Sequence, residues 1–113
     1  GEADDPVFSE GSLSSTSLDP GDTVTFQIRI QDASGVNPNT AEIYVTFLNG
    51  SQMSPRPQLS LISGSETDGV WSASFTIPAG YAGGEWRVSA LAEDTWGNCC
   101  GEGDRTIPFT VSG

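Results

Sequence analysis

Apolar and polar residues alternate with a period of two along most of this 113-residue chain. The clearest case is the segment 23–31, in which one face collects the apolar residues Val24, Phe26, Ile28 and Ile30. This alternation gives a β-strand one face for the core and one face for solvent. Because no window shows the apolar spacing of an amphipathic helix, the pattern predicts an all-β protein.

Turn residues divide the chain into seven such segments, at a spacing of roughly ten residues. Asn49-Gly50 and Asp68-Gly69 indicate tight turns, because these residue types tolerate positive φ angles. The expected strands cover residues near 7–15, 23–31, 41–48, 58–63, 70–77, 85–92 and 105–111. We therefore predict a single immunoglobulin-like β-sandwich of about seven antiparallel strands, without the cysteine pair that joins two strands in antibodies. Their shared phase predicts that five residues are buried together: Phe26, Val45, Trp71, Phe75 and Trp86.

The charge of the chain excludes several classes of function. It has 15 acidic residues, four arginines, no lysine and no histidine, which gives a formal charge of −11. Without histidine and lysine there is no Ser–His or Cys–His nucleophile pair, no histidine metal ligand and no Schiff base. The acidity also argues against nucleic acid and anionic membrane surfaces as partners. We therefore expect no enzymatic activity, and the short apolar runs predict no membrane insertion.

Several motifs share one pattern over most of the chain from about residue 12. They are Pro20-Gly21-Asp22-Thr23-Val24-Thr25-Phe26, Asp68-Gly69-Val70-Trp71, Phe75-Thr76-Ile77-Pro78, Gly84-Glu85-Trp86-Arg87-Val88, Asp94-Thr95-Trp96-Gly97-Asn98 and Phe109-Thr110-Val111. This pattern resembles the immunoglobulin-like repeats of large bacterial secreted and cell-surface proteins. The chain departs from it at Cys99-Cys100 and at Trp96, where small or polar residues are commoner.

The resemblance implies a secreted or cell-surface location and a non-enzymatic structural or adhesive role. Its partners are then the other domains of the parent chain, or a cell-surface ligand. We expect residues 1–113 to be one domain excised from a larger extracellular protein, with residues 1–6 as a flexible linker. An accessory module of a secreted hydrolase is the alternative, and the parent open reading frame would separate the two.

Ten of the 15 carboxylates fall at one end of the expected sandwich, with only Arg105 expected nearby to oppose them. They are Glu2, Asp4, Asp5, Asp32, Glu66, Asp68, Glu93, Asp94, Glu102 and Asp104. Like charges this dense repel one another, and calcium, which takes oxygen ligands, would relieve the repulsion. The preferred calcium ligands come from three segments that meet at that end: Asp4, Asp5, Asp32, Asp94 and Asn98. A solvated acidic surface without metal is the alternative.

The two cysteines are adjacent, so they cannot form a disulfide between distant strands of this chain. Four states remain: a disulfide between the neighbours, two free thiols, bonds to another chain, or metal ligation. An oxidising extracellular setting favours the first state. We therefore predict that Cys99 and Cys100 are joined to each other.

Two aromatic residues fall in expected loops rather than strands, namely Trp96 and Tyr81. Exposed loop aromatics can stack on sugar rings, so a module that binds polysaccharide through Trp96 and Tyr81 is a second hypothesis. The alternative is that each ring folds back to cover an end of the sandwich.

Overall fold

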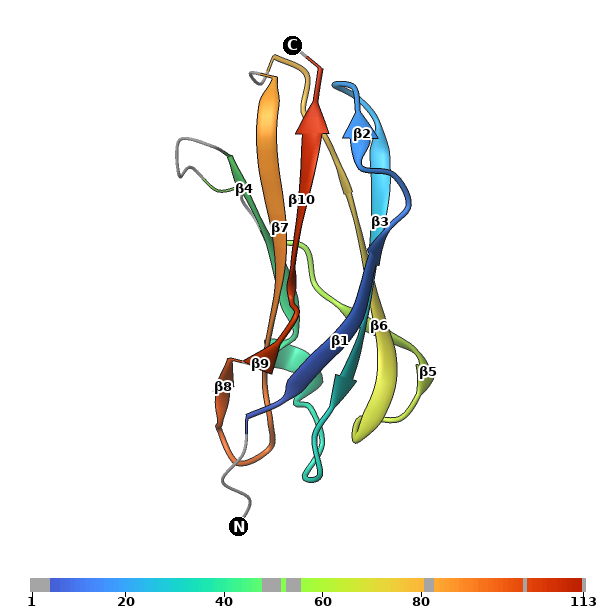
Figure 1. Ribbon diagram of the computed structural model, residues 1–113. Coiled ribbons are helices and arrows are strands. Elements are labelled where there is room, and N and C mark those ends of the chain that lie inside the picture. The colour runs from blue at the N-terminus through green and yellow to red at the C-terminus, as the bar shows by residue number, and fades with distance from the viewer. Residues whose placement is uncertain (1–4, 48–51, 53–55, 81–82, 101, 113) are drawn as a thin grey trace.

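The computed structural model describes residues 5–47, 52, 56–80, 83–100 and 102–112, with the backbone alone at residues 99, 100 and 102. Two sheets pack face to face in an elongated body of 48 × 25 × 21 Å (Figure 1). The elements are β1 (Val7–Leu13), β2 (Ser17–Leu18), β3 (Thr23–Gln31), the 3-10 helix η1 (Pro38–Thr40), β4 (Glu42–Phe47), β5 (Ser60–Gly64), β6 (Asp68–Thr76), β7 (Gly84–Glu93), β8 (Cys99–Cys100), β9 (Glu102–Gly103) and β10 (Thr106–Val111). In this described part, no helix is long and apolar enough to cross a membrane.

The strand order divides the chain between the two sheets. One sheet has the order β5-β6-β3-β1-β9, and the other has the order β2-β10-β7-β4, with β8 paired to β7. Most neighbours are antiparallel, whereas β1 with β9 and β2 with β10 are parallel. The all-β sandwich predicted from the alternation is therefore confirmed, with two short parallel pairings that the sequence pattern did not indicate.

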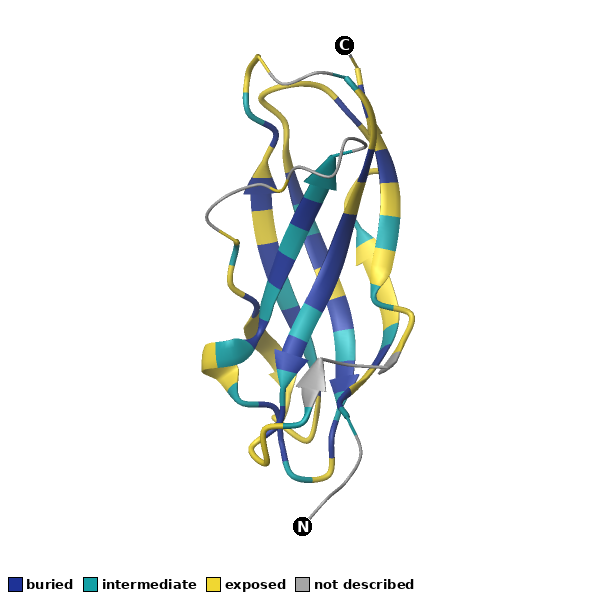
Figure 2. Cartoon of the chain, turned by 90° about the vertical axis from the view of Figure 1, so that its left-hand side faces the viewer, coloured by how far each residue is buried: buried dark blue, intermediate teal, exposed yellow. Residues whose placement is uncertain are grey.

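The core lies between the sheets and follows the predicted phase. Buried and exposed bands alternate along the strands (Figure 2). All five residues predicted to be buried together belong to one core cluster: Phe26, Val45, Trp71, Phe75 and Trp86. The ring of Trp86 lies 4.1 Å from that of Phe47 and 5.9 Å from that of Phe109, measured between centroids. Trp86 therefore joins side chains from β4 and β10 to its own strand.

The first expected strand, near residues 7–15, corresponds to β1, and a second short strand, β2, follows it. β1 pairs with β3, and its register shifts between Ser9 and Ser12, where Glu10 has a φ of 57°. β2 then pairs with β10 in the opposite sheet. The bulge itself lies within β1, because Ser12 and Leu13 beyond it still pair with β3. The chain changes sheets only between Leu13 and Ser17.

Residues from about Glu93 to Asp104, between the last two expected strands, were expected to form an irregular loop. This expectation was wrong, because the segment contains the short strands β8 and β9. β8 pairs with the end of β7 through Ala92–Cys100 and Glu93–Cys99, and β9 pairs with β1. The prediction failed because these pairings are two residues long and carry no alternating pattern. The expected strand 58–63 is displaced to Ser60–Gly64, an edge strand whose residues are all exposed, with Ile62 53% exposed.

Candidate functional site

Three loops meet at the end of the sandwich where β1 begins. The segment 32–37 follows β3, the segment 65–67 precedes β6, and the turn 94–98 joins β7 to β8. Backbone bonds hold them together: Val36 N donates to the carbonyl of Glu66 at 2.8 Å, and Thr95 N donates to that of Gly35 at 3.0 Å. The sequence topology predicted this meeting of loops. We call these three segments the loop end.

The turn 94–98 is organised by the buried carboxylate of Asp94. Its Oδ1 accepts hydrogen bonds from the backbone N–H groups of Trp96 and Asn98, at 2.9 and 2.8 Å. Its Oδ2 accepts from the side-chain amide of Asn98 at 2.8 Å. Gly97 has a φ of 83°, a conformation that glycine adopts without strain. Asp94 therefore acts as the internal acceptor that closes this turn.

Asp32 plays a similar part in the neighbouring segment. It is 4% exposed, and its Oδ1 accepts from Ser34 N at 3.0 Å, Ser34 Oγ at 2.7 Å and Gly35 N at 3.2 Å. These bonds form the pattern by which an aspartate stabilises a tight turn. Two of the acids that sequence analysis predicted as calcium ligands, Asp32 and Asp94, therefore have a structural role in their own turns.

The turns of Asp94 and Asp32 are bonded to one another, because Thr95 donates from its backbone N–H to Gly35 O at 3.0 Å and from Oγ1 to Ser34 O at 3.1 Å. Burial acts to raise the pKa of Asp94, but hydrogen bonds from the Asn98 side chain and from the backbone N–H groups of Asn98 and Trp96 hold that pKa below its ordinary value of 3.8. A lowered pKa keeps this buried carboxylate charged, and hydrogen bonds or a bound cation balance such a charge.

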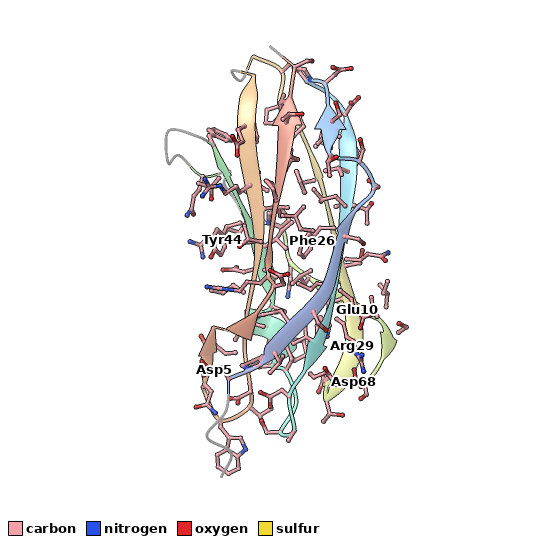
Figure 3. The ribbon with its side chains drawn as sticks, in the orientation of Figure 1. Asp5, Glu10, Phe26, Arg29, Tyr44 and Asp68 are labelled. Carbon is pink, nitrogen blue, oxygen red and sulfur yellow. The ribbon has the colours of Figure 1, made fainter. Side chains whose placement is uncertain are left out.

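The predicted calcium ligands are placed only in part. Asp32, Asp94 and Asn98 lie together, as predicted, whereas Asp4 lies outside the described residues. Asp5 is half-buried just before β1, beside β9 in the view of Figure 3. Within the described ranges, no group of three or more acidic or cysteine side chains is arranged to hold a metal ion. Calcium binding by the full set stays a prediction.

A cation that sequence analysis missed lies on the outer face of β3. Arg29 donates to both carboxylate oxygens of Asp68 at 2.9 Å, and to Glu10 at 3.0 Å (Figure 3). The hydrogen bond from Arg29 lowers the pKa of Asp68, and its two acidic partners raise the pKa of Arg29 above its usual range. The expectation that only Arg105 opposes the acids was therefore wrong. The bulge at Glu10 brings this carboxylate to Arg29, and no spacing rule reveals a bulge.

No protein-family model and no curated protein matches the chain. Among solved structures, it is similar to a Niemann-Pick type C2 protein from Japanese carpenter ant, with a TM-score of 0.59 and 9% identity over 97% of this chain and 93% of that chain. It is also similar to the GspB Siglec domain, with a TM-score of 0.63 and 12% identity over 98% of this chain. This chain spans 59% of the length of that second chain.

The chain has an immunoglobulin-like β-sandwich fold. At these identities the likeness shows the fold alone, so functional residues must be argued from the chain itself. In an immunoglobulin-like sandwich, ligand-contacting loops cluster at the ends of the sheets. The loop end of this chain occupies that position in the sandwich.

Trp96 lies at the tip of this immunoglobulin-like loop end and is 61% exposed. It therefore does not cover the end of the sandwich. Tyr81, its predicted companion, lies outside the described residues. The side chains of Cys99 and Cys100 are likewise outside the description, so their bond stays a prediction.

Proposed function

We propose that this chain is a non-enzymatic structural module of a secreted or cell-surface protein, which acts as a rigid spacer between neighbouring domains. The observation that carries the proposal is the position of the first and last strands. β1 begins at one end of the 48 Å long axis, and β10 finishes at the other (Figure 1). Domains attached before β1 and after β10 would therefore extend along one line.

The hydrogen-bond pattern suits a module that carries load along this axis. β1 runs antiparallel beside β3, and β10 lies between β2 and β7. Hydrogen bonds between antiparallel strands are perpendicular to the strands. A pull along the long axis therefore loads all bonds of a terminal strand together, instead of breaking them one after another.

The chemistry of the buried acids supports the non-enzymatic part of the proposal. Asp32 and Asp94 are the buried carboxylates among the described residues, and each accepts hydrogen bonds from the backbone of its own turn. The exposed acid Asp68 is held by Arg29. With no histidine or lysine in the chain, these groups support the structure rather than acid–base or nucleophilic catalysis.

Force spectroscopy tests the spacer proposal. The chain is pulled from attachment points before β1 and after β10, and the unfolding force is compared with that from a control geometry. In the control, the attachment points are Glu85 and Thr110, which are paired neighbours on β7 and β10. Pulling these two residues apart opens the strand pair one bond at a time.

We expect end-to-end pulling to give one cooperative unfolding event at a clearly higher force than the control geometry. Forced unfolding reports the unfolding rate, so both geometries are compared at the same loading rate. An end-to-end force equal to or below the control force would show that the fold is not built for axial load, and the spacer proposal would fail.

A further inference from the structure

The side chain of Trp96 is the most exposed large apolar group in the described part of the chain. It is 61% exposed, whereas Trp71 and Trp86 are 1% and 2% exposed. A single exposed apolar residue needs no special explanation. The turn that holds Trp96, however, is held by many hydrogen bonds.

At least seven hydrogen bonds among the described residues fix this turn. Within it, Asp94 N donates to Asn98 O at 3.1 Å and Gly97 N donates to Asp94 O at 3.1 Å, in addition to the three bonds accepted by the Asp94 carboxylate. Two further bonds from Thr95 anchor it to the neighbouring loop: the backbone N–H donates to Gly35 O at 3.0 Å, and Oγ1 donates to Ser34 O at 3.1 Å. A ligand that binds the indole therefore loses little conformational entropy of the loop.

The surroundings of the indole are polar and too small for a stable protein interface. Thr95 and Gly97 on either side are exposed, and Asn98 is half-buried. A specific protein interface buries at least about 1,000 Å², far more than one indole offers. One aromatic face with polar neighbours has instead the dimensions of one sugar ring. The electron-rich face attracts the polarised C–H bonds of a pyranose, and carboxylate and carbonyl oxygens accept hydrogen bonds from its hydroxyl groups.

The negative charge of the loop end indicates which class of sugar can bind. Glu66 is exposed, Glu93 is half-buried, and neither takes part in an ion pair among the described residues. The negative field of these acids disfavours anionic sugars and phosphates. The same field attracts cations, so a cation over the ring is the competing ligand. The carboxylate closest in sequence to the indole, that of Asp94, is 2% exposed and bonded inward, so it offers a cation over the ring no direct ion pair.

We propose that the Trp96 turn binds a neutral, hydroxyl-rich glycan by stacking the indole on a pyranose ring. This binding role goes beyond the spacer proposal and does not depend on it, because the spacer proposal is tested by force and this one by ligand binding.

Tryptophan fluorescence tests the proposal on the unmodified chain. All three tryptophans are described, and Trp96 alone is open to an added quencher. We would titrate the chain with neutral hexasaccharides of glucose, mannose and xylose, with polygalacturonate as the anionic probe and with tetra-arginine as the cationic probe. We expect at least one neutral hexasaccharide to shift the emission to shorter wavelength and to protect it from acrylamide, and polygalacturonate to have no effect.

Variants then show whether Trp96 carries the binding. Trp96→Ala should weaken binding of that hexasaccharide by at least about tenfold by calorimetry, whereas Trp96→Phe should stay within about threefold. The matched control is Ile62→Ala on β5, which removes another exposed apolar side chain and should leave binding unchanged. The melting temperatures of all variants should equal that of the parent, because these side chains are largely exposed. The proposal would be overturned if the chain bound only tetra-arginine or none of the probes. It would also be overturned if Trp96→Ala bound the hexasaccharide as tightly as the parent chain.

Discussion

At the scale of single residues, Trp71 is unusual because it buries an N–H group that has no hydrogen-bond partner among the described residues. An unsatisfied buried donor costs about 1–3 kcal/mol. Trp71→Phe removes that donor, and this gain offsets the loss of packing area. We expect the free energy of unfolding to change by less than about 1 kcal/mol.

Trp86→Phe is the matched comparison in the same core. Trp86 packs its ring against Phe47 and Phe109, and we expect the smaller ring to cost roughly 2 kcal/mol. Urea unfolding of both variants measures the difference. Equal losses for the two variants would mean that the Trp71 N–H carries no penalty.

Residues also set the limit of what the sequence predicts about the loop end. Asp32, Asp94 and Asn98 were placed together correctly, because topology alone brings their loops to one end. Their use as turn acceptors could not be predicted, since it depends on which way each carboxylate rotates. The pairing of Arg29 with Glu10 was hidden for another reason, because it needs the bulge in β1.

At the scale of elements, Arg29 on β3 links β1 to β6 through Glu10 and Asp68. The pKa of Asp68 is lowered from 3.8 in the folded chain, so this group stabilises the fold above pH 3.8. That contribution is lost as the pH falls below 3.8 and Asp68 takes up a proton. We expect Asp68→Asn to reduce the loss of stability on acidification, compared with the parent chain. The measurement is urea unfolding between pH 5 and pH 2, with Glu85→Gln, which lies outside this ion pair, as the control variant; about 0.15 M salt keeps screening constant.

The hairpin of β5 and β6 depends on a glycine. A Cβ at Gly69 would clash with the carbonyl oxygen of Ser65 and with the side chain of Leu61, whereas a Cβ at Gly11 in β1 would make an ordinary contact with Ile107 at 3.4 Å. We expect Gly69→Ala to lower the free energy of unfolding by about 1–3 kcal/mol through overpacking, and Gly11→Ala to have little effect. Thermal melting measures both variants. A lower melting temperature for Gly11→Ala than for Gly69→Ala would contradict this expectation.

The strands differ in how well the sequence predicted them, for a physical reason. The segment 23–31 was predicted to the residue, because β3 lies inside its sheet and buries one full face. The bounds of β5 were predicted less well, because its apolar residues Leu61 and Ile62 are exposed, whereas the buried Leu59 lies before the strand. The apolar pattern therefore does not follow burial here. Two-residue strands such as β8 and β9 are set by their neighbours, so no local pattern could reveal them.

At the scale of the whole molecule, 15 acidic residues are opposed by four arginines, which gives the formal charge of −11. Among the described residues, Arg29 and Arg56 form the ion pairs, so most acids repel one another through solvent. Added salt screens this repulsion and should raise the melting temperature whatever the cation. The question is therefore whether calcium acts beyond screening.

The reason to expect that it does is that two buried acids, Asp32 and Asp94, lie in turns that are hydrogen-bonded to one another. A cation bound only by the folded chain stabilises it by about 2.7 kcal/mol at a hundredfold excess over Kd, which is a rise in melting temperature of about ten degrees or more. We expect calcium, after chelation of the protein, to raise the melting temperature by this margin over sodium chloride of equal ionic strength. Asp94→Asn would disturb the turn itself, so the better variant is Asp32→Asn, whose amide oxygen can still accept the bonds that Oδ1 of Asp32 accepts. The control is Asp22→Asn, before β3 at the opposite end. The extra rise should be lost in Asp32→Asn and kept in Asp22→Asn; equal effects of calcium and sodium would leave a solvated acidic surface without a site.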